Sequence, residues 1–174
     1  MDNGNYKVDG GKLRKAGYPD QYPVDYVTQW QGLTIVIENA AGTYRHWTDE
    51  ETGEEGKRLQ LWPYGYVLGS QGIDFDEVDC YLGPNPAAKF VYVIHQMKRP
   101  EFTQIDEDKV MLGWDSPAAA KREYLKHFDT PKFFGSMSVL TVEEFIEQVR
   151  DTMLNPKIIK SEPVGKLKVW RGPV

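Results

Sequence analysis

The chain has 174 residues, of which 40% are hydrophobic and 13% aromatic, so it can bury a core and is not an intrinsically disordered segment. Its net charge of −5 argues against nucleic-acid binding, and no apolar run is long enough to cross a bilayer. A single cysteine, Cys80, excludes an internal disulfide and a cysteine-rich zinc site. We therefore expect one soluble domain of a reducing, cytoplasmic compartment, with no membrane and no nucleic-acid partner.

The first two thirds of the chain are predicted to be rich in strands. Residues 1–31 combine glycine, proline and tyrosine without periodicity, and we expect them to form an extended leader. Beyond the leader, β-branched and apolar segments bounded by Gly, Pro and Asp are typical of strands. They predict strands at 33–38, 43–47, 58–61, 78–82, 89–96 and 109–114.

Two helices are predicted to follow these strands. Ser116 and Pro117 give an N-cap and a first-turn proline for a helix over 118–128. Thr141 and Glu144 have the spacing of a capping box, which begins a helix that ends near Met153.

The order of these elements indicates the fold class. Many short strands come first and the helices follow, which favours an α+β domain. We predict that residues 32–153 form this domain as a small antiparallel, OB-like β-barrel with two flanking helices. Residues 154–174, rich in proline and lysine, are expected to be a C-terminal tail or a linker.

The most informative stretch is an acidic segment in the middle of the chain. Asp74 and Asp76 are two residues apart, so on extended backbone they point to one side, and a turn can bring Asp79 to them. Carboxylates about 5 Å apart repel by roughly 3 kcal/mol at an effective dielectric constant of about 20, and a hard cation such as Mg²⁺ or Mn²⁺ removes this repulsion. A solvated acidic turn remains the alternative interpretation. On the following strand, we expect Cys80 to face the core and Tyr81 to face outward.

A tyrosine-glycine pair precedes this segment at a fixed distance. The run W-P-Y-G-Y-V places Tyr64 ten residues before Asp74, and D-F-D-E-V-D-C holds the three aspartates. Together they resemble the soluble (family I) inorganic pyrophosphatases, whose hallmark is a Tyr-Gly pair, a fixed gap and D-[small]-D-[P/E]-[apolar]-D-[apolar]. Through D-E-D-K-V-M-L-G and P-K-F-F-G-S-M the chain is also similar to the divergent pyrophosphatase-like domains of phage and mobile-element proteins. The resemblance covers residues 30–135 and implies the barrel of that family.

The resemblance implies a metal site with a proton acceptor and a set of phosphate-binding cations. It assigns Asp76 as the carboxylate that takes a proton from a metal-bound water, and Tyr64 as a hydrogen-bonding partner of the nucleophile or of a phosphate oxygen. The implied cofactor is Mg²⁺ or Mn²⁺. The implied metal ligands are Asp74, Asp79, Asp106, Asp108 and Glu38. The implied phosphate-binding residues are Arg45, Arg58 and Lys109, although surface positions in solvent are an equally open interpretation for the two arginines.

The sequence departs from the family pattern at three places. Trp47 stands where the family has a second early glutamate, so one contact to metal or water is missing. Phe75 occupies the position of a small residue in a tight turn. Residues 127–129 align with a late Tyr-Lys pair of the family and lack both groups, so Lys132 or Tyr124 is expected to substitute in binding the substrate.

These features predict Mg²⁺-dependent hydrolysis of inorganic pyrophosphate to phosphate by a metal-activated water. Two alternatives stay open: hydrolysis of a nucleotide or another phosphoanhydride, and a non-catalytic interaction module of a phage particle or mobile element that keeps the fold. Assembly into a homo-oligomer also stays open, and a phage-encoded protein would act in the host cytoplasm. Cys80 is expected to be a core residue rather than a nucleophile, and the histidines lack the spacing of zinc ligands.

Overall fold

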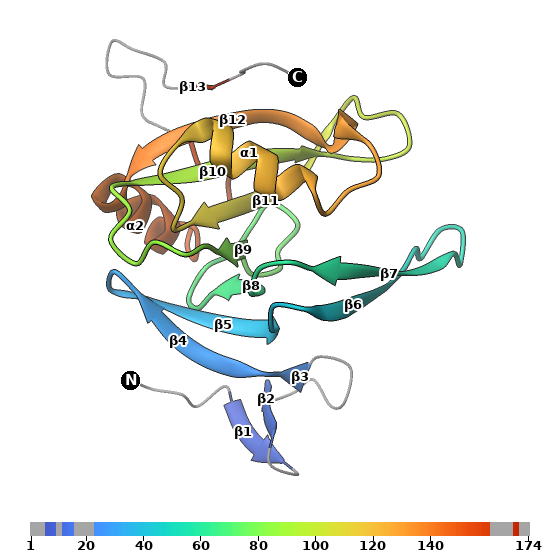
Figure 1. Ribbon diagram of the computed structural model, residues 1–174, viewed down its shortest axis with the longest axis horizontal. Helices are drawn as coiled ribbons and strands as arrows, with labels where there is room; N and C mark the ends of the chain where they lie inside the picture. Colours follow the sequence, from blue (N-terminus) through green and yellow to red (C-terminus); the bar gives the residue numbers. More distant parts are fainter. Residues whose placement is uncertain (1–5, 10–11, 16–22, 161–168, 171–174) are drawn as a thin grey trace.

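The computed structural model describes residues 6–9, 12–15, 23–160 and 169–170 (Figure 1). Strands are the predominant regular structure in this part of the chain. They are β1 (Tyr6–Asp9), β2 (Lys12–Lys15), β3 (Pro23–Val24), β4 (Tyr26–Trp30), β5 (Leu33–Asn39), β6 (Thr43–Thr48), β7 (Glu55–Gln60), β8 (Tyr64–Val67), β9 (Asp79–Leu82), β10 (Phe90–Met97), β11 (Ile105–Leu112), β12 (Phe134–Thr141) and β13 (Val169–Trp170). The helical segments are α1 (Pro117–Leu125), the short 3₁₀ helix η1 (Pro131–Phe133) and α2 (Val142–Asp151).

One large sheet organises the molecule. It has eight strands in the order β13-β12-β10-β11-β9-β8-β5-β4. Neighbouring strands run antiparallel, except for β9 and β11, which run parallel. Because β13 and β4 are the two edges of this sheet in the described part of the chain, the sheet is open and the predicted antiparallel barrel is not confirmed. The broader prediction, an α+β domain dominated by strands and carrying two α-helices, is confirmed.

Strands β6 and β7 form a separate hairpin that projects beside the large sheet (Figure 1). Its register places Arg45 opposite Arg58 and Trp47 opposite Gly56. Side chains alternate between the two faces of a strand, so these four positions share one face of the hairpin. We call it the inner face, since Arg45 on it lies over the ring of Tyr64 in the large sheet.

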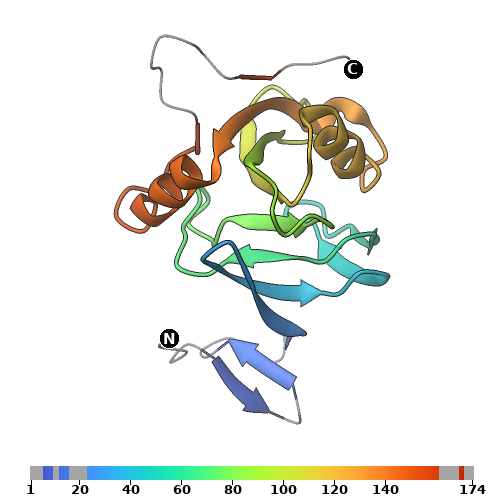
Figure 2. The same cartoon turned by 60° about the vertical axis from the view of Figure 1, so that its left-hand side comes forward.

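Apolar side chains cover both faces of the large sheet, and Figure 2 shows α1 and α2 on opposite sides of it. On one face, Val93 of β10 belongs to the same core as Phe145 of α2. On the other face, Tyr92 of β10 belongs to the same core as Tyr124 of α1. We call these the α2 face and the α1 face. The prediction that Tyr81 faces outward is wrong: β9 is a central strand covered on both faces, so Tyr81 is buried on the α1 face.

Both helices begin where their capping residues predict. The Ser116 side chain accepts a hydrogen bond from the amide of Ala119 at 3.1 Å, and Pro117 is the first residue of α1. Thr141 and Glu144 form the reciprocal capping box at the start of α2, with distances of 3.2 and 3.1 Å. These local rules fix the starts of the two helices, whereas both helices end before the predicted residues, at Leu125 and Asp151.

Other boundaries differ from the prediction. Strand β11 begins at Ile105, earlier than the predicted residue 109, and β12 was not predicted. Strand β4 falls within the expected leader and pairs with β5, while Ile159 falls within the expected tail and is buried in the α2-face core. The rest of the expected leader and tail, residues 1–5, 10–11, 16–22, 161–168 and 171–174, lies outside the described residues. No helix in the described ranges is long and apolar enough to span a membrane.

Candidate active site

Lys109 lies at the centre of a polar cluster on the α1 face of the sheet, which we call the ion cluster. Its ammonium nitrogen is 2.6 Å from Asp79 Oδ2 and 2.8 Å from Glu107 Oε1. Asp79 begins β9, the parallel neighbour of β11, and pairs directly with Lys109 in register. Glu107 lies two residues before Lys109 on β11, so both side chains point the same way. The side chains of Asp79 and Glu107 keep 18% and 21% of their surface exposed, so solvent reaches the cluster through its carboxylates.

Tyr64 completes the cluster from β8. Its buried hydroxyl donates a hydrogen bond to Asp79 Oδ2 at 2.5 Å and accepts one from Lys109 at 2.8 Å. The glycine that follows has a steric reason: a Cβ at Gly65 would lie 1.8 Å from the carbonyl oxygen of Val36 on β5. The Tyr-Gly pair thus lets β8 pack tightly against β5 and fixes the tyrosine hydroxyl beside Asp79.

Arg45 brings a second cation to the ion cluster from the inner face of the hairpin. Its guanidinium carbon is 4.7 Å from the centre of the Tyr64 ring. Charge interaction with Tyr64 raises the pKa of Arg45 most, while burial acts in the opposite direction. The carboxylates Asp79, Glu38 and Glu107 raise this pKa further. Glu38, at the end of β5, is therefore close enough to act on the cluster.

The two carboxyl groups of the ion cluster respond differently to burial. Burial acts to raise the pKa of Asp79, but the charges of Lys109 and Arg45 outweigh it and hold that pKa below its usual value. For Glu107 burial dominates and raises the pKa to about 7, even though Lys109 acts to lower it. Asp79 is therefore the permanent anion of the cluster, whereas Glu107 exchanges its proton near neutral pH.

Asp74 and Asp76 lie on a turn just before β9. The backbone amide of Asp76 donates to Asp74 Oδ1 at 3.2 Å, and Phe75 between them has a φ of 66° and is 72% exposed. The backbone here is therefore the tight turn expected at Phe75, not the extended backbone that would point Asp74 and Asp76 to one side. Burial raises the pKa of Asp74, and the nearby charges of Asp76 and Asp79 raise it further. The three carboxylates are thus close enough to repel one another.

A comparison with models of protein families connects the acidic turn and the ion cluster with one family. The sequence model of inorganic pyrophosphatases matches residues 2–150, a span that contains the acidic turn and the whole ion cluster. The chain belongs to the inorganic pyrophosphatase family. A comparison with curated proteins gives no match. In this member of the pyrophosphatase family, the structure brings Tyr64, Asp79, Lys109 and Arg45 together, as the sequence predicts.

Asp108 is not part of this site, and its predicted role as a metal ligand is wrong for this structure. Its Oδ1 lies 2.6 Å from His95 Nδ1, and its Oδ2 accepts a hydrogen bond from the amide of Ile159 at 2.8 Å. The other ring nitrogen of His95 lies 2.8 Å from the hydroxyl of Ser138. The physical reason is strand alternation, which turns Asp108 to the α2 face and Lys109 to the α1 face.

Glu107 is the site residue that the sequence prediction missed. We expected β11 to start at residue 109, so the alternation of side chains was not applied to the acidic residues before it. Extending the strand to Ile105 shows that Glu107 shares a face with Lys109, and this spacing of two was the available signal. Asp106 lies at the bulge where β11 shifts register against β10, and its charge contributes to the raised pKa of Glu107.

The remaining predicted substrate-binding residues lie in different parts of the structure. Arg58 is directly opposite Arg45 on the inner face, with its guanidinium carbon 4.3 Å from the centre of the Phe128 ring. Lys132 is exposed on η1 and is not among the residues that line the cavity beside Arg58. Tyr124 is buried and donates its hydroxyl to Gln96 Oε1 at 2.8 Å, so it does not replace the missing late tyrosine.

The oxygen donors of the site suit a hard divalent cation. The candidate ligands are carboxylates, which suit Mg²⁺, and the hydrogen bonds of Asp79 in the described part of the chain all use Oδ2, so Oδ1 is available. The pKa of Asp74 is raised first by burial, and the charges of Asp76 and Asp79 raise it further. Among the described residues, however, no three His, Cys, Asp or Glu side chains converge closely enough to hold an ion. The chemistry of these carboxylates fits a hard divalent cation.

Proposed function

We propose that this chain hydrolyses inorganic pyrophosphate to phosphate with Mg²⁺ or Mn²⁺ as cofactor. The observation that carries the proposal is the ion cluster: a carboxylate with a lowered pKa, a buried lysine and a tyrosine hydroxyl, held within 3 Å of one another beside Arg45. Family membership supports the same reaction class.

The arginine pair supports binding of a phosphoanhydride. Arg45 and Arg58 are directly opposite each other on adjacent strands, an arrangement that is destabilising for like charges. An anion between them removes this repulsion, and the guanidinium fork suits phosphate oxygens. We therefore place the phosphates on the inner face of the hairpin, between the two arginines. The three donors of Lys109 already bond to Asp79, Glu107 and Tyr64, so its contribution to phosphate binding is its charge.

The acidic residues supply the other half of the reaction. We assign Asp74 and Asp79 as metal ligands, with Glu38, Asp106 and Glu107 as further carboxylates near the ion. When bound, the metal lowers the pKa of a water that it holds and offsets charge on the leaving phosphate. Asp76, exposed on the turn, accepts the proton of the attacking water. Tyr64 holds Asp79 and Lys109 in place, because its hydroxyl bonds to both.

A second candidate, a non-catalytic module that keeps the fold, is favoured by one observation: no three potential ligands converge among the described residues. Phosphate release separates the two candidates. With Mg²⁺ and pyrophosphate, we expect phosphate release by the unaltered chain, and a loss of roughly 100-fold or more in Asp76→Asn because a general base is removed.

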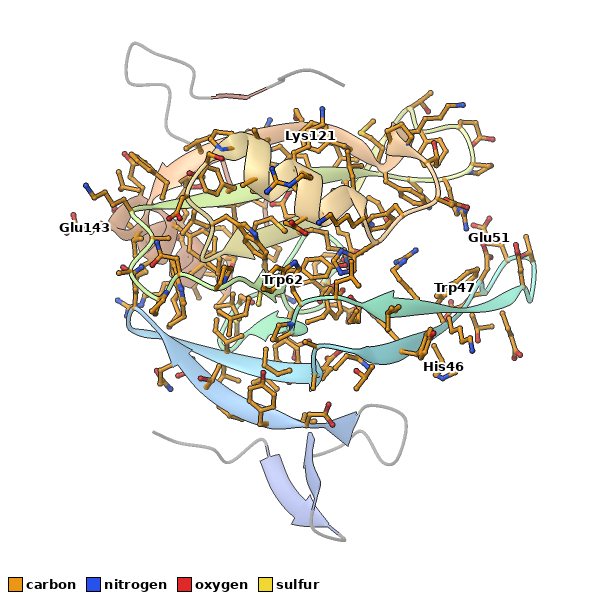
Figure 3. The ribbon with its side chains drawn as sticks, in the orientation of Figure 1. His46, Trp47, Glu51, Trp62, Lys121 and Glu143 are labelled. Atoms are coloured by element: carbon orange, nitrogen blue, oxygen red, sulfur yellow. The ribbon has the colours of Figure 1, made fainter. Side chains whose placement is uncertain are left out.

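Glu143→Gln is the matched control for this assay. Glu143 is a carboxylate on α2, at the far side of the molecule from the hairpin (Figure 3), and its removal should leave phosphate release intact. Failure of the unaltered chain to release phosphate from pyrophosphate with either metal refutes the hydrolase and supports the module. Full activity in Asp76→Asn refutes the role of that residue. Mg²⁺ should also raise the melting temperature, since it binds only the folded state.

A further inference from the structure

A hollow adjoins the site on the inner face of the hairpin, and we call it the hairpin pocket. Its volume is about 320 Å³, within the range of sites that hold small ligands. Trp47 and Arg58 line it from the hairpin, and Arg99, Lys126, His127 and Asp129 line it from the opposite side. Of these residues, only Arg58 has a role in the proposed hydrolysis of pyrophosphate.

The pocket is positively charged. Arg58, Arg99 and Lys126 contribute cations, and Asp129 is the one carboxylate of the lining, 3.9 Å from Arg99 at an exposed position. His127 adds no charge at neutral pH, because burial lowers its pKa. Its Nε2 accepts a hydrogen bond from the amide of Leu61 at 3.0 Å. The pocket therefore attracts an anion. Its Arg99–Asp129 pair is exposed on both sides and weak enough for an anion to displace, whereas Lys126 is also paired with Glu123 at 2.9 Å.

Lys57 also borders the pocket but points elsewhere. Its ammonium lies 4.5 Å from the centre of the Tyr44 ring, and both residues are on the outer face of the hairpin by strand alternation. The guanidinium of Arg58, stacked on Phe128, is by contrast held on the inner face. The anion-binding end of the pocket is thus the end next to Arg58 and Arg45, where the proposed function places the phosphates.

The other end of the pocket is aromatic. The indole of Trp47 covers Gly56 on the paired strand so closely that a Cβ there would lie 2.3 Å from Trp47 Cζ2. Figure 3 shows Trp47 and His46 on opposite sides of the hairpin, so the indole belongs to the inner face. Trp47 lies two residues beyond Arg45 on β6, a distance of about 7 Å along the strand. This spacing matches the separation of a base from the phosphates of a nucleotide across a ribose.

The ring face of an indole has nothing to stack on in inorganic pyrophosphate, which has no apolar surface, and only the indole N–H can donate a hydrogen bond to a phosphate oxygen. A nucleobase, by contrast, stacks on tryptophan, and each such contact changes affinity by roughly 5- to 100-fold. We propose that the hairpin pocket binds the nucleoside of a nucleoside di- or triphosphate. This proposal rests on the proposed function. The base lies against Trp47, and the terminal phosphates lie toward Arg58 and Arg45.

The reaction on such a substrate is the same hydrolysis. The oxygen of water bonds to the terminal phosphorus while the bridging P–O bond breaks and the bridging oxygen leaves with the shortened nucleotide. The products are orthophosphate and a nucleotide with one phosphate fewer, and the proton of the water passes to Asp76.

Binding of two matched ligands tests the pocket without relying on turnover. α,β-Methylene-ADP and methylenediphosphonate share an uncleavable P–C–P group and differ by the nucleoside. With Mg²⁺ present, titration calorimetry should show that the unaltered chain binds the nucleotide analogue about tenfold more tightly than the diphosphonate. In Trp47→Leu, the ratio of the two affinities should fall to about one. His46→Leu, the neighbouring aromatic on the outer face, should keep the ratio of the unaltered chain.

Each outcome decides the proposal. Equal affinity of the unaltered chain for the two ligands overturns it, and so does a ratio that Trp47→Leu leaves unchanged. If a melting curve shows that Trp47→Leu does not fold, Trp47→Phe replaces it. The smaller ring should give an affinity ratio between that of the unaltered chain and one. An unchanged ratio in Trp47→Phe would contradict the proposal. Phosphate release from pyrophosphate is measured separately, so failure of the hydrolase and failure of the pocket are distinguishable.

Discussion

The two faces of the large sheet each hold a buried polar cluster, and the short stretch over 107–109 of β11 contributes to both. On the α1 face Lys109 contacts carboxylates whose side chains are 18% and 21% exposed. On the α2 face Asp108 contacts His95, and their side chains are only 4% and 2% exposed. One cluster is open to solvent at its carboxylates, and the other is sealed in the core.

The clusters also differ in how their oxygens are used. Both oxygens of Asp108 accept hydrogen bonds, from His95 and from the amide of Ile159. Asp79 receives its described hydrogen bonds, from Tyr64 and Lys109, on Oδ2 alone. A sealed cluster whose acceptors are all occupied stabilises the fold, whereas an open cluster with a spare oxygen can bind a ligand. The difference separates Asp108, a core residue, from the neighbouring residues of the proposed site within one short segment.

The largest expected effect comes from the open cluster. Asp79→Asn keeps an oxygen for Tyr64 but removes the charge that faces Lys109 and the proposed metal. We expect phosphate release to fall by roughly 100-fold, the scale of a lost electrostatic group at a catalytic site. The matched control is Asp108→Asn, because the amide can bond to both of its partners once His95 exchanges its ring tautomer. Equal activity in the two variants would contradict the assignment of the open cluster as the site.

The sealed cluster should show its effect in stability. Asp108→Ala leaves the His95 ring and the Ile159 amide without their acceptor in the core. The cost is about 2–4 kcal/mol in the free energy of unfolding, measured by urea denaturation. Specific activity of the folded protein should stay near that of the unaltered chain. A variant as stable as the parent, or one folded but inactive, would show that the α2-face cluster is not simply structural.

The smallest effect is a pH dependence from Glu107. Its pKa is raised from 4.5 to about 7 in the folded state, chiefly by burial. Between these values the folded protein binds more protons than the unfolded chain, so the contribution of Glu107 to stability falls as pH rises from 4.5 to 7. The difference in unfolding free energy between the parent and Glu107→Gln should therefore decrease across this window. A difference that is constant or increases would show that Lys109 outweighs burial.

Local rules made part of this fold predictable. Ser116 and the Thr141–Glu144 pair fix helix starts within a few residues, and the structure shows both caps. Strand β12 escaped prediction because its residues mix aromatic, small and polar types. Ser138 fits the core only through His95 on the neighbouring strand, a long-range contact that no local pattern reveals.

The site was predictable to a similar extent. The family resemblance identifies Tyr64 and Asp79 from the spacing between them, and Lys109 from the D-E-D-K segment, so it finds residues on three strands of one cluster. Asp108 was misassigned because a run of acidic residues looks like a loop, and the wrong strand start hid which of them share a face. The hairpin pocket depends on Trp47 facing residues more than fifty positions away, which only the tertiary structure shows.

The hydrogen bond from the Ile159 amide to Asp108 shows that the folded domain extends beyond the segment that the family model matches. The family match ends at residue 150, within α2, yet Ile159 is fully buried in the α2-face core and satisfies a buried carboxylate. A protein shortened to the matched segment would lose this seal and admit water to the His95–Ser138 pair. A boundary for expression, domain fusion or limited proteolysis therefore belongs beyond residue 160, not where the shared pattern of the family ends.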